Sequence, residues 1–87
     1  FEAKEWLDKR YEGDSSRYVQ CQPRFWGDEL SCPETEPGQD RVYVETISDR
    51  QLGRRLIPAR EKDLWSRVDS YNVDGVEILT YWVNEAS

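Results

Sequence analysis

Cys21 and Cys32 are the two cysteines of the chain and stand eleven positions apart. A pair of thiols can form a disulfide, bind a metal ion or remain reduced in a core. A structural zinc site needs four ligands, mostly cysteine and histidine, and this sequence has no histidine and no third cysteine. We therefore expect no metal and no cofactor, and the choice lies between a disulfide and a buried, reduced pair.

The segment between the cysteines reads CQPRFWGDELSC and is typical of a β-hairpin. In a regular hairpin, the residue numbers of any two facing residues add up to the same total. A four-residue loop at 25–28 therefore puts Cys21 opposite Cys32. The same loop puts Pro23 opposite Leu30 in a non-hydrogen-bonded pair, where the missing N–H of proline costs little. The cysteines fall in a second such pair, with a Cα separation of about 4.5 Å that suits a disulfide.

Two aromatic residues, Phe25 and Trp26, stand at the predicted turn beside Arg24 and Asp28. Aromatic and arginine side chains are enriched among the residues that dominate protein interfaces. We expect this tip, together with Tyr43 on the following strand, to bind a protein partner. The alternative is that Phe25 and Trp26 fold back onto the core and serve packing alone.

The sequence shows no recognisable motif for general acid–base or nucleophilic catalysis. Histidine is absent, which removes the commonest general base near neutral pH. The carboxylates that could act as acid and base lie in expected loops or on a polar helix face: Asp28, Glu29, Glu34, Glu36 and Asp69. Solvated surface explains these positions, and the sequence has no phosphate-binding glycine loop. We therefore expect a protein that is not an enzyme.

Arginine dominates the basic residues between positions 50 and 67, and this composition gives an alternative function. Arginine makes bidentate contacts with phosphate, so converging arginines could hold RNA or a phosphate group. The candidates are Arg50, Arg54, Arg55, Arg60 and Arg67. The formal net charge of −6 opposes nucleic-acid binding. Pairing with neighbouring carboxylates explains the same arginines without a ligand.

The spacing of apolar residues predicts the elements that would position these side chains. Helical spacing predicts an N-terminal helix over 1–11 and a second helix near 58–71. Alternation predicts strands at 17–26, 41–48 and 76–83. The last of these is apolar on both faces, so we expect it at the centre of a sheet.

These elements predict an α+β fold in a single domain, 1–87, with a mostly antiparallel sheet of about four to five strands. If a strand replaces the helix near 58–71, the alternative is an all-β sandwich. An exposed strand edge could also pair with a strand of a partner protein, and the segment RVYVETIS at 41–48 is the expected donor.

Composition limits the setting in which the chain acts. No apolar run approaches the roughly 18 residues of a membrane span, so we expect no membrane association. We interpret the chain as a protein-binding module, a monomer or weak dimer, that acts as an effector or inhibitor of a protein partner. A disulfide would favour secretion, whereas reduced thiols would favour the cytoplasm.

Overall fold

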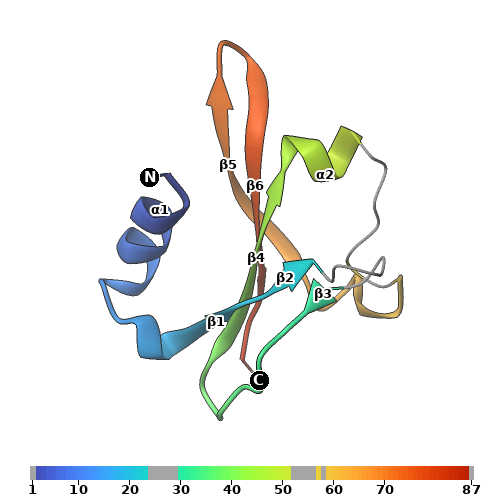
Figure 1. Ribbon diagram of the computed structural model, residues 1–87. Helices are drawn as coiled ribbons and strands as arrows, with labels where there is room; N and C mark the ends of the chain where they lie inside the picture. The colour runs from blue at the N-terminus through green and yellow to red at the C-terminus, as the bar shows by residue number, and fades with distance from the viewer. Residues whose placement is uncertain (1, 24–29, 52–56, 58, 87) are drawn as a thin grey trace.

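The computed structural model describes residues 2–23, 30–51, 57 and 59–86 (Figure 1). In chain order the elements are α1 (Glu2–Tyr11), the 3-10 helix η1 (Ser15–Arg17), β1 (Tyr18–Gln20), β2 (Gln22–Pro23), β3 (Leu30–Ser31), β4 (Asp40–Thr46), α2 (Ile47–Gln51), the 3-10 helix η2 (Ala59–Glu61), β5 (Ser66–Val73) and β6 (Val76–Asn84). The strands form a four-stranded sheet in the order β1-β4-β6-β5 and a separate pair of β2 with β3. β1 runs parallel to β4, and the other neighbours are antiparallel. This small compact domain confirms the predicted α+β fold.

Helix α1 covers one face of the four-stranded sheet. Leu7 and Tyr11, one helical turn apart, are buried against Val42 of β4 and Val83 of β6. Both residues lie in the N-terminal helix that the spacing of apolar residues predicts over 1–11. The Tyr11 hydroxyl donates a hydrogen bond to Asp40 Oδ2 at 2.9 Å, and burial raises the pKa of Tyr11 to about 12.

A second apolar cluster lies on the opposite face of the sheet. It contains Cys21, Tyr43 and Trp65, and Trp82 packs against it. Tyr43 of β4 faces Trp82 of β6, and successive strand residues point to opposite faces. The sheet is therefore the middle layer of the domain, with α1 on one side and the β2–β3 hairpin and α2 on the other (Figure 1).

The β2–β3 hairpin confirms the predicted disulfide and its register. Pro23 pairs with Leu30, and the disulfide joins Cys21 to Cys32, whose Cα atoms are 4.3 Å apart. The N–H of Cys21 donates to the carbonyl of Val42 at 2.7 Å, away from the hairpin partner, as a non-hydrogen-bonded pair requires. Cys21 thus connects the hairpin to β4 through its backbone and to β3 through its side chain.

Strand β6 lies between β4 and β5, which confirms the central position predicted for 76–83. A tight turn at Asp74 and Gly75 joins β5 to β6, with φ angles of 51° and 79°. Turns with both φ values positive match the twist of a hairpin, and Asp-Gly is a preferred sequence for them. The end of this hairpin extends beyond the neighbouring strands (Figure 1).

The second helix expected near 58–71 is wrong. The described part of that segment forms only the short η2 and then the strand β5. Its apolar residues have helical spacing, but Leu64 is 57% exposed whereas Trp65 is 5% exposed. Pairing along β6 decides the structure, because tertiary contacts override a weak helical preference. The all-β sandwich is also wrong, since α1 and α2 are helices.

Helix α2 begins where the strand expected at 41–48 ends early. Thr46 Oγ1 accepts a hydrogen bond from the N–H of Asp49 at 3.2 Å, which stabilises the helix start. Asp49 is 9% exposed and its Oδ2 accepts a hydrogen bond from the Tyr43 hydroxyl at 3.0 Å. The Thr-x-x-Asp spacing is typical of the start of a helix. The sequence interpretation missed it because the alternation of the preceding residues predicts a strand.

We predict that replacing both cysteines with alanine lowers the free energy of unfolding by about 3 kcal/mol, because an open loop leaves the unfolded chain less restricted. Urea unfolding followed by tryptophan fluorescence measures the difference. Ser31→Ala changes an exposed residue of β3, retains the disulfide and should stay within about 0.5 kcal/mol of wild type. Equal unfolding midpoints for the double variant and the wild type would contradict a structural role for the disulfide.

Candidate functional site

Four residues of the predicted recognition tip, Arg24, Phe25, Trp26 and Asp28, lie outside the described residues. Their role in partner binding stays a prediction. The fifth residue of that set, Tyr43, is in the core and only 1% exposed. A side chain with so little surface is not available to a partner, so Tyr43 does not belong to the candidate contact surface.

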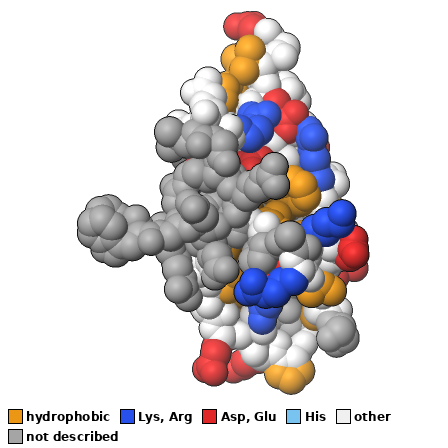
Figure 2. All heavy atoms as spheres, turned by 90° about the vertical axis from the view of Figure 1, so that its right-hand side faces the viewer, with side chains coloured by type: hydrophobic (Ala, Val, Ile, Leu, Met, Phe, Trp, Pro, Cys, Tyr) orange, Lys and Arg blue, Asp and Glu red, His pale blue; other side chains and the backbone are white. Residues whose placement is uncertain are grey.

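The candidate phosphate-binding arginines divide into two groups. Arg54 and Arg55 lie outside the described residues. The other three form ion pairs within the chain: Arg50 and Arg67 with Glu77, and Arg60 with Glu61. On the face that carries α2 and η2, Lys and Arg side chains lie beside Asp and Glu side chains (Figure 2). Ion pairs within the chain therefore account for these three candidate arginines without a ligand.

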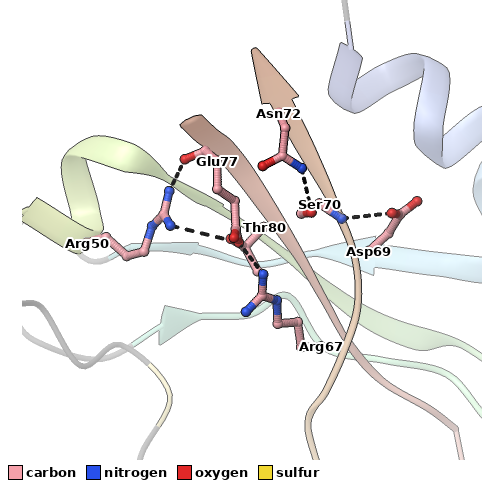
Figure 3. Close-up of polar contacts among 7 residues, drawn as sticks. All are labelled: Arg50, Arg67, Asp69, Ser70, Asn72, Glu77 and Thr80. Carbon is pink, nitrogen blue, oxygen red and sulfur yellow. Dashed lines mark hydrogen bonds and ion pairs between the residues drawn. The ribbon is translucent and has the colours of Figure 1, made fainter. Parts of the chain in front are cut away.

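Glu77 accepts the best-formed of these contacts. Its Oε1 lies 2.6 Å from Arg67 Nη2 and 3.8 Å from Arg50 Nη1, and it accepts a hydrogen bond from the Thr80 hydroxyl (Figure 3). The register between β5 and β6 skips Ile78, and such a bulge redirects the next side chain. Glu77 therefore lies on the same side of the sheet as Thr80. The Thr80 hydroxyl and the two guanidinium groups lower the pKa of Glu77.

The candidate acid–base carboxylates that the structure describes lie at the surface. Glu34, Glu36 and Asp69 are exposed, while Asp28 and Glu29 lie outside the described residues. Among the residues that the structure describes, no three Asp, Glu, Cys or His side chains cluster as metal ligands would.

Burial raises the pKa of Glu45, although the nearby Trp82 indole and Arg50 favour its charged form. Glu45 and Thr80 are paired across β4 and β6. Glu45 and Glu77, whose pKa values are shifted in opposite directions, therefore both neighbour Thr80.

The strand expected to offer a free edge, 41–48, has a strand on each side. β1 pairs with β4 at Asp40–Val42, and β6 pairs with it along Arg41–Thr46, so the prediction of a free edge along the whole strand is wrong. The parallel pairing of Tyr18–Gln20 along β4 is a long-range contact that alternation in 41–48 does not encode. The ends of the described sheet are β1, with three residues, and β5, with eight.

Strand β5 is the long open edge of the described sheet. One side of it pairs with β6, and no other described strand pairs with its second side. The register against β6 skips Val68, which is 37% exposed, and Val73 near the turn is 42% exposed. An open edge presents backbone N–H and C=O groups with which another extended chain can pair.

A groove of about 400 Å³ separates α1 from β5. Its lining residues are Glu5, Trp6 and Lys9 from α1 and Asp69, Tyr71 and Tyr81 from the sheet. Trp6 stacks flat on Tyr81 with ring centres 4.2 Å apart. The indole N–H of Trp6 donates to Asp69 Oδ2 at 2.9 Å. The open edge and an aromatic groove therefore adjoin each other, and we name them together the β5 surface.

Helices within the described ranges fall short of the length and apolar character that crossing a membrane would require.

Comparison with known proteins found no matching protein family, curated protein or solved structure. The candidate site therefore rests on the geometry of the β5 surface.

The sequence interpretation missed this surface because it assigned 58–71 to a helix. The signal that could have found it is the Asp74-Gly75 pair between two runs rich in β-branched and aromatic residues, which is a strong hairpin signal. A strand extended back from that turn includes Asp69 and Tyr71. The groove itself needs α1 placed over β5, which no local pattern reveals.

We predict that Glu77→Gln makes stability less dependent on pH in acid. Because the pKa of Glu77 is lowered by folding, its ionised form contributes stability above the usual glutamate range. That contribution is lost as the pH falls through the lowered pKa. Between about pH 5 and pH 3 the free energy of unfolding should therefore fall less steeply in the variant than in wild type.

Urea unfolding at several pH values measures these slopes. Glu85→Gln is the matched control, because Glu85 makes a longer, more exposed ion pair with Arg10 at 3.7 Å. This control should follow the wild-type slope. A Glu77→Gln slope equal to that of wild type would contradict the assigned role of Glu77.

Proposed function

We propose that this chain is a non-catalytic protein-binding module that acts as an effector or inhibitor by pairing β5 with an extended segment of a partner. The observation that carries the proposal is the eight-residue edge strand β5 at the end of the described sheet. Backbone hydrogen bonds supply affinity in this mode of recognition, and pockets for alternate side chains supply specificity.

Two features favour a partner other than a second copy. The net charge of −6 on each chain opposes self-association. In addition, the bulge at Val68 interrupts regular pairing near the start of β5, and bulges are a common protection against edge-to-edge pairing of like sheets. A partner segment can adapt to this edge, whereas a rigid copy of β5 carries the same irregularity.

The disulfide-linked hairpin supports a second contact with the same partner. The bond between Cys21 and Cys32 restrains β2 and β3 relative to each other, and we retain the predicted contact of Phe25 and Trp26 with the partner as part of the proposal. A disulfide also suits an oxidising compartment, and we extend the proposal to a secreted protein. The RNA or phosphate alternative has less support, because the described candidate arginines already contact carboxylates.

The test uses a phage library of random peptides selected on the wild-type chain. Val73 and Val76 pair next to the two-residue turn, where hairpin geometry places a hydrogen-bonded pair. Alternation then directs the N–H of Asn72 away from β6. Asn72→Pro removes this donor at an edge position that tolerates proline. Asn72→Thr is the matched control, because it keeps the N–H and also loses the contact of the Asn72 side chain with Ser70.

We predict that Asn72→Pro weakens binding of an enriched synthetic peptide at least tenfold, or about 1.4 kcal/mol. Asn72→Thr should bind within about twofold of wild type, and both variants should unfold at similar temperatures. Isothermal titration calorimetry measures affinity, and hydrogen exchange should show that the peptide slows exchange at the Asn72 amide. Equal peptide affinity for the proline and threonine variants, or no change in exchange along β5, would overturn the proposal.

A further inference from the structure

We propose that the groove between α1 and β5 receives a lysine or arginine side chain of the partner segment. This inference rests on the proposed function and adds the chemistry of the residue that is recognised. It follows from the position of the groove, from a fixed carboxylate beside it and from the charge of the region.

The groove lies where alternate side chains of an added strand would point. Asp69 contacts Trp6 of α1, so its side chain lies on the α1 side of the sheet. A strand paired to β5 directs every second side chain to that side. Facing side chains of neighbouring strands have Cβ atoms about 4.5–5.5 Å apart. A partner residue opposite Asp69 would therefore reach both the carboxylate and the groove.

The carboxylate of Asp69 is held in place before any partner arrives. Its Oδ2 accepts the indole N–H of Trp6 at 2.9 Å, and its Oδ1 accepts the N–H of Ser70 at 2.8 Å. Figure 3 shows Asp69 extending away from the Glu77 cluster, with its contact to Ser70. Each carboxylate oxygen can accept a further hydrogen bond. An added strand can take up the outward Ser70 N–H, whereas the contact with Trp6 remains, so an ammonium or guanidinium group meets a carboxylate that Trp6 holds in place.

The aromatic lining of the groove suits a cation with an aliphatic stem. Lysine and arginine cover apolar surface with their methylene groups while their charged ends stay solvated. The faces of Trp6 already contact Tyr81, with ring centres 4.2 Å apart, and the guanidinium of Arg10, 5.7 Å from the ring centre. The charged end of a partner side chain is therefore expected to meet Asp69, while its methylene groups pack along the aromatic lining.

Charge in this part of the chain favours a basic partner residue over an acidic one. Among the lining residues, Glu5 and Lys9 of α1 carry opposite charges, so Asp69 leaves the lining with a net negative charge. Arg10, which lies over Trp6, forms an ion pair with Glu85. Residues 68–87 contain four acidic side chains and no basic one. An aspartate or glutamate at the groove position would face Asp69 and be repelled, since like charges directly opposite each other destabilise strand pairing.

The experiment uses a synthetic copy of the β5-binding peptide with the highest enrichment, and a second copy in which its basic residue is norleucine. Two variants of the chain are compared with wild type. Asp69→Asn removes the charge at the groove. Asp74→Asn makes the same charge change at the turn, about 16 Å along the strand, and asparagine tolerates the positive φ of that position.

We expect the norleucine peptide to bind wild type about fivefold more weakly than the original peptide. Asp69→Asn should weaken the original peptide by about the same factor and should remove its advantage over the norleucine peptide. Asp74→Asn should change affinity by less than about twofold. Affinity for Asp69→Asn should also depend less on salt concentration.

The outcomes separate this inference from the function on which it rests. If enriched peptides slow exchange along β5 but lack a basic residue, or if norleucine and Asp69→Asn have no effect, the cationic specificity is wrong and strand addition stands. If no peptide affects exchange along β5, strand addition itself fails, and this inference fails with it.

Discussion

Strand β6 buries both of its faces and pairs both of its edges, and the rest of the structure follows from that constraint. Val83 packs on the α1 side and Trp82 on the hairpin side, so each face needs its own cover. The amphipathic helix α1 supplies one cover. The other depends on Cys21, which ties the β2–β3 hairpin to β4. With β4 and β5 on the two edges of β6, β5 is left at the outside of the sheet.

Features set by short-range rules could be predicted from the sequence. The residue numbers of Cys21 and Cys32 add up to the same total as those of Pro23 and Leu30. This equality predicts the hairpin register, and the structure confirms it. The apolar stripe of α1 and the two apolar faces of β6 could also be predicted from the sequence. The strand β5 could not, because Trp65 and its apolar neighbours also have helical spacing, and pairing with β6 is what selects the extended form. Bulges at Val68 and Ile78 further weaken the alternation by which strands are recognised.

The candidate site was less predictable than the fold, because it depends on strand order and layer packing. Alternation suggests that 41–48 is a strand but does not show that β1 covers its edge. The sequence predicts that Asp69 is a solvated carboxylate. Only the hydrogen bond from Trp6 of α1 gives it a fixed position beside a groove. Likewise, the arginine-rich segment suggests phosphate binding until Glu77 is found between Arg50 and Arg67. In each case the deciding partner is distant in sequence.

The account depends most directly on β5 being an open edge, and amide hydrogen exchange of the free protein, followed by NMR, tests it. Val73 forms the hydrogen-bonded pair next to the turn, whereas the Asn72 amide points outward from the sheet. The account predicts that Val73 exchanges at least about ten times more slowly than Asn72, after correction for intrinsic rates. Equal protection of the two amides would mean that the outer side of β5 is already paired, and would contradict the account.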